Sequence, residues 1–432
     1  MRGRCVQKGG DAMKRPHMPA VMQDTRLRSV ILLAAIAGIA FGLTIPFLTL
    51  TARERGMSLR DIGIMASSYL IVQMCLQLPF GALSDRIGRR IPIAVGFALE
   101  GIATAGFTLA DSPEAFIGLR VLQGISLALI MPALRALIAD LTPIEQRGQA
   151  FAWLFAGFSG GILLGPPIGG LLAAPLGRNP VFLMSAVVNV IMVLFVILVV
   201  RAPARVESTG PSEKIPMRAL FTPGLIGAFM VGFGARVPEG IFAGLWSIYL
   251  EDLGASDTVI GLSYSTFAVS SLLMTPYGGR LADRGMRWRI ILIANMAMGA
   301  LTIGYGVLPF IVAILMLGFM EGAVLSVATP ALDAYLASTA DPRIQGRVQG
   351  AFATISTSGA AVAALFGTVL YDLGHWVPFA IAGSALILVN LLAFRLIRTS
   401  EYAARARRMA DIQVAIQADR DASTSSGAAA IA

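Results

Sequence analysis

Apolar runs long enough to cross a lipid bilayer recur along this chain of 432 residues and constrain its fold more than any other feature. A bilayer core about 30 Å thick needs roughly 20 helical residues. Lipid offers no partner to backbone polar groups, and these runs are too long for membrane-spanning strands, so we expect helices. Charged residues and prolines separate these runs and predict twelve spans: 29–50, 59–82, 91–109, 114–139, 149–175, 181–200, 224–250, 259–282, 289–308, 310–336, 348–370 and 376–397.

Composition excludes an ordinary soluble enzyme. The chain is 56% hydrophobic and 14% charged, whereas a soluble domain carries about 25% charged residues. The formal net charge of +9 would suit a nucleic-acid-binding protein, but the basic residues lie between apolar runs rather than in one patch. We therefore expect no nucleic-acid partner.

Catalytic and metal-binding patterns are also missing from the sequence. The two cysteines, Cys5 and Cys75, indicate no disulfide framework and no metal-ligand spacing. The two histidines, His17 and His375, fall in a tail and a loop, and there is no Ser/His/Asp set. We expect neither an enzyme nor a cofactor or metal.

Arginine and lysine predict the orientation. If both termini are cytoplasmic, the external loops hold only four of the 34 basic residues, which are Arg53, Arg55, Arg60 and Arg178. This bias is strongly positive-inside. Residues 1–28 are basic without an apolar stretch of their own, so we expect a retained cytoplasmic tail rather than a signal peptide. Residues 398–432 form a second cytoplasmic tail, which we expect to be disordered from Ser423. The preference for arginine over lysine favours a bacterial plasma membrane protein.

The chain contains one long internal repeat. Sliding it against itself by 198 positions aligns Gly56, Ser58, Ile62, Gly63, Ser67, Gly81, Leu83, Asp85 and Arg86 with Gly254, Ser256, Ile260, Gly261, Ser265, Gly279, Leu281, Asp283 and Arg284. This predicts two six-helix bundles, 29–200 and 223–397, joined by a cytoplasmic linker at 201–222. Because six is even, both bundles have one orientation and could rock about a central site.

The connection between the second and third spans carries the most specific motif. It reads Gly81-Ala-Leu83-Ser-Asp85-Arg86-Ile-Gly88-Arg89-Arg90, with a degraded copy around Asp283 and Arg284. Here the chain resembles the major facilitator superfamily, whose signature loop is G-x-L-x-D-R-x-G-R-R/K. The duplicated element suggests a cytoplasmic latch between conformations. The alternative is a solvated ion pair in a positive loop.

Two further motifs resemble the twelve-helix drug/proton antiporters of that superfamily. Arg120, Gln123 and Gly124 fit R-x-x-Q-G-x-G, with Ser126 at the last glycine, and the resemblance assigns Arg120 to proton coupling. The alternative is a packing arginine bonded to backbone carbonyls. The fifth span fits G-x-x-x-G-P-x-x-G-G with Gly161, Gly165, Pro166, Pro167, Gly169 and Gly170.

The glycines of the fifth span form a flat stripe for close helix packing, and the two prolines should bend the helix. In the second half Ala364 and Leu365 replace the prolines. This asymmetry favours an exporter, whereas plain helix packing would require no proline pair.

The other ionisable residues inside the spans are functional candidates because burying them in lipid is costly. They are Glu100, Arg135, Arg236, Glu239, Glu321 and Asp333. The family resemblance places Arg120, Arg236, Glu239 and Glu321 on cavity-lining helices and Glu100 on a peripheral one. Glu239 or Glu321 could carry a proton, although structural pairing, such as Arg236 with Glu239, is an equal alternative. The repeat-equivalent Arg135 and Asp333 are gate candidates.

These patterns predict an all-α secondary transporter with alternating access, most like a proton-coupled exporter of a small lipophilic or cationic molecule. We expect it to act as a monomer whose partners are its small-molecule substrate, protons and the lipid bilayer. The alternatives are uptake or export of a sugar or organic acid, and a transport-inactive membrane sensor.

Overall fold

The computed structural model describes residues 24–143, 146–200, 220–283, 287–340 and 345–429. These residues form helices and no strand. The helices are α1 (Thr25–Glu54), α2 (Leu59–Ile87), α3 (Arg90–Gly106), α4 (Pro113–Leu141), α5 (Arg147–Leu176), α6 (Arg178–Val199), α7 (Pro223–Asp252), α8 (Asp257–Asp283), α9 (Arg287–Val307), α10 (Ile311–Thr339), α11 (Gln345–Tyr371) and α12 (Val377–Ala429). The predicted all-α class with twelve helices is confirmed.

Eleven of the described helices are long and apolar enough to cross a membrane. The remaining helix, α3, has 17 residues, which span roughly 25 Å. Its last residue is followed by the buried Phe107, so the apolar segment continues beyond the helix. The chain is a multi-pass membrane protein.

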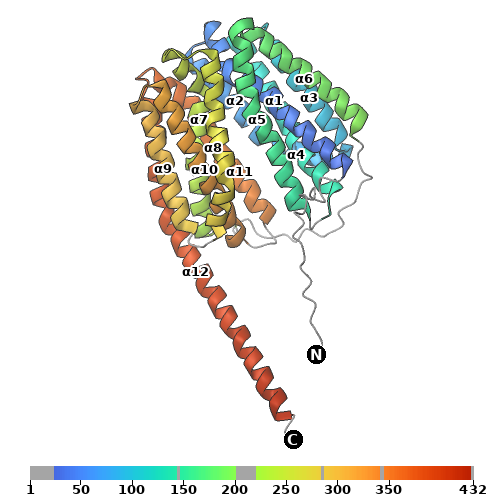
Figure 1. Cartoon of the computed structure of the whole chain (residues 1–432), viewed down its shortest axis with the longest axis vertical. Helices are drawn as coiled ribbons and strands as arrows, with labels where there is room; N and C mark the ends of the chain where they lie inside the picture. Colours follow the sequence, from blue (N-terminus) through green and yellow to red (C-terminus); the bar gives the residue numbers. More distant parts are fainter. Residues whose placement is uncertain (1–23, 144–145, 201–219, 284–286, 341–344, 430–432) are drawn as a thin grey trace, which may run out of the picture.

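Helix packing repeats between the two halves of the chain. In the first half α1 packs on α5, α2 on α4 and α3 on α6; in the second, α7 packs on α11, α8 on α10 and α9 on α12. Figure 1 shows the two sets of six helices beside one another. The halves meet through α5 against α8 and through its repeat-related counterpart, α11 against α2.

The turns that open the second helix of each half have the same backbone geometry. Gly56 has φ +83° and Gly254 has φ +82°, a left-handed conformation that favours glycine. The N–H of Gly56 donates to Arg53 O at 2.9 Å, and that of Gly254 donates to Glu251 O at 2.8 Å. The repeat found in the sequence is therefore also present in the local structure.

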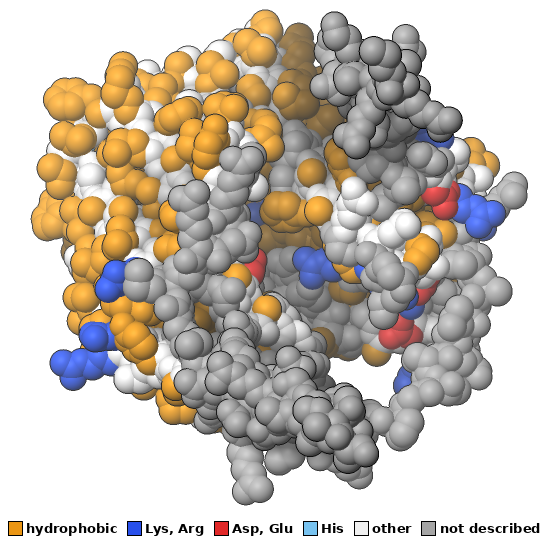
Figure 2. Space-filling model, turned by 60° about the horizontal axis from the view of Figure 1, so that its bottom comes forward, with side chains coloured by type: hydrophobic (Ala, Val, Ile, Leu, Met, Phe, Trp, Pro, Cys, Tyr) orange, Lys and Arg blue, Asp and Glu red, His pale blue; other side chains and the backbone are white. Residues whose placement is uncertain are grey.

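Among the residues that the structure describes, the halves share a hydrophobic core at one end only. One buried cluster contains residues from both halves, including Phe47, Leu50 and Leu250, near the α1–α2 and α7–α8 turns. The other two clusters are each confined to one half. Figure 2 views the opposite end, which is hollowed, with hydrophobic walls and charged side chains visible inside. We call these the closed end and the open end.

The last helix extends well beyond the bundle, as Figure 1 shows. It continues to Ala429, so the disorder expected from Ser423 is wrong. The segment is rich in alanine and arginine, which are strong helix formers. The predicted N-terminal tail and most of the linker lie outside the described residues.

Candidate functional site

A polar network lies inside the first half, where α3 meets α4. Arg120 Nη1 donates to Gln123 Oε1 at 2.7 Å, and Gln123 Nε2 donates to Glu100 Oε1 at 2.7 Å. Gln123 is only 2% exposed and Glu100 only 8%. Glu100 was predicted to be peripheral on the family resemblance, but its side chain is linked to Arg120 through one amide.

Arg120 also contacts α2. Its guanidinium carbon lies 4.2 Å from the centre of the Tyr69 ring, a cation–π arrangement. Its Nε atom is buried and has no hydrogen-bond partner among the described residues, which is a costly state for a cationic group. The predicted alternative, an arginine bonded to backbone carbonyls, does not match these side-chain contacts.

A buried carboxylate occupies the corresponding part of the second half. Glu321, on α10, is 3% exposed. Its Oε2 accepts a hydrogen bond from the Tyr305 hydroxyl, on α9, at 2.5 Å. The Trp246 and Tyr305 rings meet edge to face at 5.0 Å between centroids. Among the described residues no cation forms an ion pair with Glu321.

Arg236 and Glu239 form an ion pair on α7, across the buried Pro238. Their side chains are 43% and 54% exposed. A pair with this exposure is solvent-screened and contributes about 0–1 kcal/mol. Glu239 is therefore neutralised locally, whereas Glu321 is not.

The connection between α2 and α3 is organised by Arg89. Its guanidinium pairs with Asp85, at the end of α2, and its Nε lies 2.9 Å from Asp140 Oδ2, at the end of α4. Partial burial disfavours the charged guanidinium, but the two carboxylates outweigh it and raise the pKa of Arg89 above its ordinary value. The motif therefore joins three helices of one half.

The other residues of this motif have separate positions. Gly88 has φ +87°, which allows the sharp exit from α2. A Cβ atom on Gly81 would lie 3.6 Å from Pro132 Cβ, an ordinary contact, so this glycine is not required by close packing. Arg86 is exposed, and Arg90 donates to the carbonyl of Ile197. The side chain of Asp283, and Arg284 as a whole, lie outside what the structure describes.

The glycine stripe of α5 packs directly on α1. A Cβ atom on Gly161 would lie 2.8 Å from Gly38 Cα, and one on Gly165 would lie 2.6 Å from Gly42 Cα. Both distances are shorter than real Cβ contacts, so a larger residue would force the helices apart. Gly169 fits against Leu43 in the same way, whereas Gly170 faces Asp257 of the other half.

The proline pair creates a contact between the halves. Pro167 has no N–H, so the helix provides no donor for the carbonyl of Leu163. The hydroxyl of Ser265, on α8, donates to that carbonyl at 2.9 Å. Helix α5 continues through both prolines.

The repeat-related position lacks this contact. Ser67 corresponds to Ser265, but its hydroxyl donates to Ile64 O within its own helix at 3.1 Å. Leu365 replaces Pro167 in the repeat and keeps its N–H, so it frees no carbonyl. The asymmetry of the prolines thus has a direct structural consequence at the interface between the halves.

The gate candidates do not meet in this conformation. Arg135 and Asp333 are both exposed, and no ion pair joins them in the described part of the chain. Each lies toward the open end, on α4 and α10.

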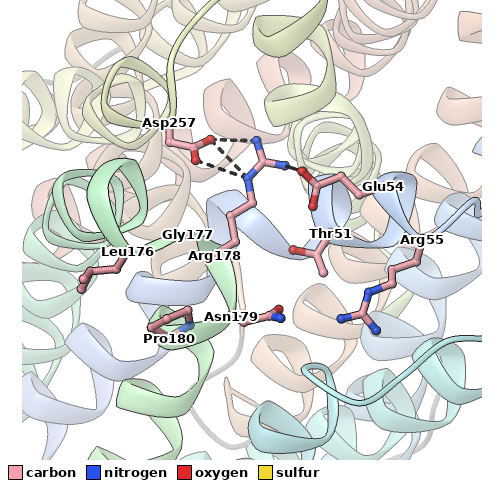
Figure 3. Close-up of a pocket in the computed structure, with 9 residues that line it drawn as sticks. All are labelled: Thr51, Glu54, Arg55, Leu176, Gly177, Arg178, Asn179, Pro180 and Asp257. Carbon is pink, nitrogen blue, oxygen red and sulfur yellow. Dashed lines mark hydrogen bonds and ion pairs between the residues drawn. The ribbon is translucent and has the colours of Figure 1, made fainter.

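A charge cluster that the sequence reasoning missed joins the halves at the closed end (Figure 3). Arg178, at the start of α6, bonds Glu54 Oε1 at 2.7 Å, Glu251 Oε1 at 2.8 Å and Asp257 Oδ1 at 2.8 Å. Glu54 belongs to its own half, and the other two carboxylates belong to the second half. Arg178 also lines a cavity of about 420 Å³. The other lining residues are Thr51, Glu54, Arg55, Leu176, Gly177, Asn179, Pro180 and Asp257.

A second arginine extends this cluster. Arg53 Nη1 lies 2.6 Å from Asp252 Oδ1, whose second oxygen accepts from the Tyr371 hydroxyl at 2.9 Å. We call Arg53, Glu54, Arg178, Glu251, Asp252 and Asp257 the closed-end cluster. The sequence signal was the concentration of these charges beside three predicted external loops.

Two pseudo-symmetric six-helix bundles, with buried charges inside and a hollow at one end, define a membrane transport protein. The family model described as the Major Facilitator Superfamily matches residues 30–239 and 224–416, so the chain belongs to that superfamily. It is a transporter of small molecules and not an enzyme.

The relatives and solved structures support this assignment. The chain is 23% identical over 373 residues to the quinolone resistance protein NorA of Staphylococcus aureus, covering 82% of this chain and 93% of that protein. It is 28% identical to multidrug resistance protein 1 of Bacillus subtilis, covering 80% and 90%. A D-xylose–proton symporter has the same fold, with a TM-score of 0.72, 17% identity, and coverage of 86% and 98%.

Proposed function

We propose that this protein is a proton-coupled exporter of small lipophilic or cationic molecules in a bacterial plasma membrane. The arginine bias supports an orientation with the open end and both termini in the cytoplasm. In that orientation the described conformation receives substrate from the cytoplasm, and the closed-end cluster seals the external side.

The buried carboxylate of Glu321 is the observation that carries the proposal. A carboxylate inside the membrane with no cationic partner is expensive when charged, so it is suited to take up and release a proton. Tyr305 can donate to either form of the acid. The Arg236–Glu239 pair already compensates its own charge, so Glu321 is the stronger candidate for proton carriage.

The names of two relatives support the substrate class and direction, since both are called drug or multidrug resistance proteins. Within the chain, the proline pair of α5 and its absence from α11 support export. The hydrophobic walls of the hollow suit a lipophilic molecule.

The test is substrate-induced proton movement in proteoliposomes, with ethidium as the probe. Export by exchange moves protons against the direction of the probe, whereas proton-coupled uptake moves them with it. We expect Glu321→Gln to reduce proton movement by at least half and Glu239→Gln to reduce it less. If both variants couple like the parent, the carrier assignment is wrong. Absence of probe movement in the parent would favour a sensor.

A further inference from the structure

We propose that Glu100 is a second proton-binding site of this transporter, linked to Arg120 through the side-chain amide of Gln123. The inference rests on the proposed proton coupling and adds a site in the first half, on α3, which packs on α4 and α6 of the same half. Three observations carry it: the fixed polarity of the network, the small cavity beside the carboxylate, and the absence of a direct counter-ion.

The polarity of the network is fixed by Arg120. A guanidinium only donates hydrogen bonds, so the atom of Gln123 facing Arg120 must be the amide oxygen. The amide nitrogen of Gln123 must then face Glu100, which accepts its hydrogen bond at 2.7 Å. The Gln123 amide is thereby oriented with the positive end of its dipole toward Glu100. Its hydrogen bonds to Arg120 and to Glu100 couple the two charged groups.

Glu100 has room for a proton donor on its other side. It lines a cavity of about 20 Å³, together with residues of α1, α4, α5 and α6 that include Phe158 and Asn189. That volume is about the minimum for one water molecule, for which Glu100 and Asn189 are the polar residues of an otherwise apolar lining. Residues of five helices close this cavity, and Phe158 belongs to α5, which packs against the other half. A movement of the halves could therefore open or close the route by which Glu100 gains and loses its proton.

The charges around Glu100 are few. Of the neighbouring helices, α4 contributes Arg120, which is one amide away, and α2 contributes the titratable Tyr69 beneath that guanidinium. The cavity residues from α1, α5 and α6 are uncharged. Within the described part of the chain Glu100 thus lacks a direct ion pair, and in a low-dielectric interior the free energy of its anion depends on where Arg120 lies.

Proton binding at Glu100 and the position of Arg120 are therefore linked. The charged carboxylate holds Gln123, and through it Arg120, against the Tyr69 ring. Protonation forms an O–H bond on Glu100, removes the negative charge and weakens this hold. Conversely, a substrate that displaces Arg120 makes the anion less favourable and promotes proton uptake. Such linkage is reciprocal.

The test compares Glu100→Gln with the parent in detergent and in proteoliposomes, with ethidium as the probe. We expect the affinity of the parent for ethidium to change with pH and that of Glu100→Gln to lose at least half of this dependence. In Glu100→Gln, proton movement on ethidium addition should fall by about half if Glu321 carries a second proton. If Glu100 is the only carrier, proton movement should fall to background. Probe-for-probe exchange, which needs no net proton step, should persist in Glu100→Gln.

Two variants separate proton binding from structure. Glu100→Asp retains an acid and should restore proton movement with a displaced pH profile. Glu114→Gln makes the same chemical change on the exposed first turn of α4 and should behave like the parent. Because Glu100→Gln could disturb folding, infrared difference spectra of the parent and Glu100→Asp should also show a protonated-carboxyl band that responds to ethidium.

The failures are distinguishable. If the parent moves protons and Glu100→Gln matches it in pH dependence, the inference about Glu100 is overturned and the proposed function stands. If the parent moves no protons in response to ethidium, the proposed function fails and the inference falls with it. Equal loss of exchange in Glu100→Gln and Glu100→Asp, with no carboxyl band, would mean that Glu100 has only a structural role.

Discussion

The guanidinium of Arg178 lies 2.8 Å from Glu251 Oε1, which joins the start of α6 to the end of α7 across the two halves. The Arg178 side chain is only 13% exposed, so water screens the contact less than at an ordinary surface pair. The same guanidinium binds Asp257, also of the second half. This one side chain thereby binds two carboxylates of the other half.

Replacing Arg178 should shift the protein toward a conformation open at this end. In Arg178→Gln the three carboxylates lose their shared cation and repel one another. Breaking a fully buried pair costs about 3–5 kcal/mol, and the partial exposure here reduces this to about 1–2 kcal/mol, equivalent to roughly tenfold in the population ratio. Labelling of a cysteine introduced at Thr258 should become faster.

The matched control is Arg55→Gln. Arg55 lies at the same end, but it bonds Asp111 and the carbonyls of Ala110 and Thr108, all within the first half. Its replacement should leave the labelling rate near that of the parent. Equal acceleration in both variants would argue against a specific role for Arg178.

Ser265→Ala should weaken the closed conformation by removing the donor to the Leu163 carbonyl. An unpaired carbonyl costs about 1–3 kcal/mol when fully buried; this contact is partly buried, so we expect the lower end of that range and several-fold more opening in the same labelling assay. Ser67→Ala is the control, because its hydroxyl bonds only within α2. Indistinguishable behaviour of the two alanine variants would contradict this account of the proline pair.

Gly161→Ala should destabilise the first half, whereas Gly160→Ala should not. A methyl group at 161 would lie 2.7 Å from Ile39 N, and overpacking of this kind costs about 1–3 kcal/mol. No atom lies within 4 Å of the Cβ position at 160, and alanine favours helix over glycine by about 1 kcal/mol. Thermal unfolding in detergent should show a lower transition temperature for the first variant alone.

Arg89→Gln should lower the stability of the α2–α3 connection by a margin that does not change between pH 7 and 9. The pKa of Arg89 is raised in the folded chain. Its stabilising effect is therefore complete below the pKa of an arginine in the unfolded chain, which lies well above pH 9, and is lost only as pH rises through the still higher folded pKa. A stability difference that fades toward pH 9 would show that another group titrates at this site.

Sequence reasoning predicted what depends on regular spacing. The offset of 198 anticipated the matching turns at Gly56 and Gly254, and the four-residue period of glycines anticipated the close packing of α5. The link between Glu100 and Arg120 was missed because the position of the helix alone placed Glu100 at the periphery. The side chains of Glu100 and Gln123 are long enough to connect the two helices. The closed-end cluster was missed because its members come from four helices and become neighbours only when the halves dock.

The hydrogen bond between Ser265 and the carbonyl of Leu163 has a consequence for hydration if the closed end opens. If the halves alternate as proposed and α8 moves away with Ser265, the partly buried carbonyl of Leu163 loses its hydrogen bond, and water would have to replace it. Separation of the halves there should thus coincide with wetting of the α5–α8 seam. An apolar molecule bound between α5 and α8 would exclude water from this interface and should therefore slow opening.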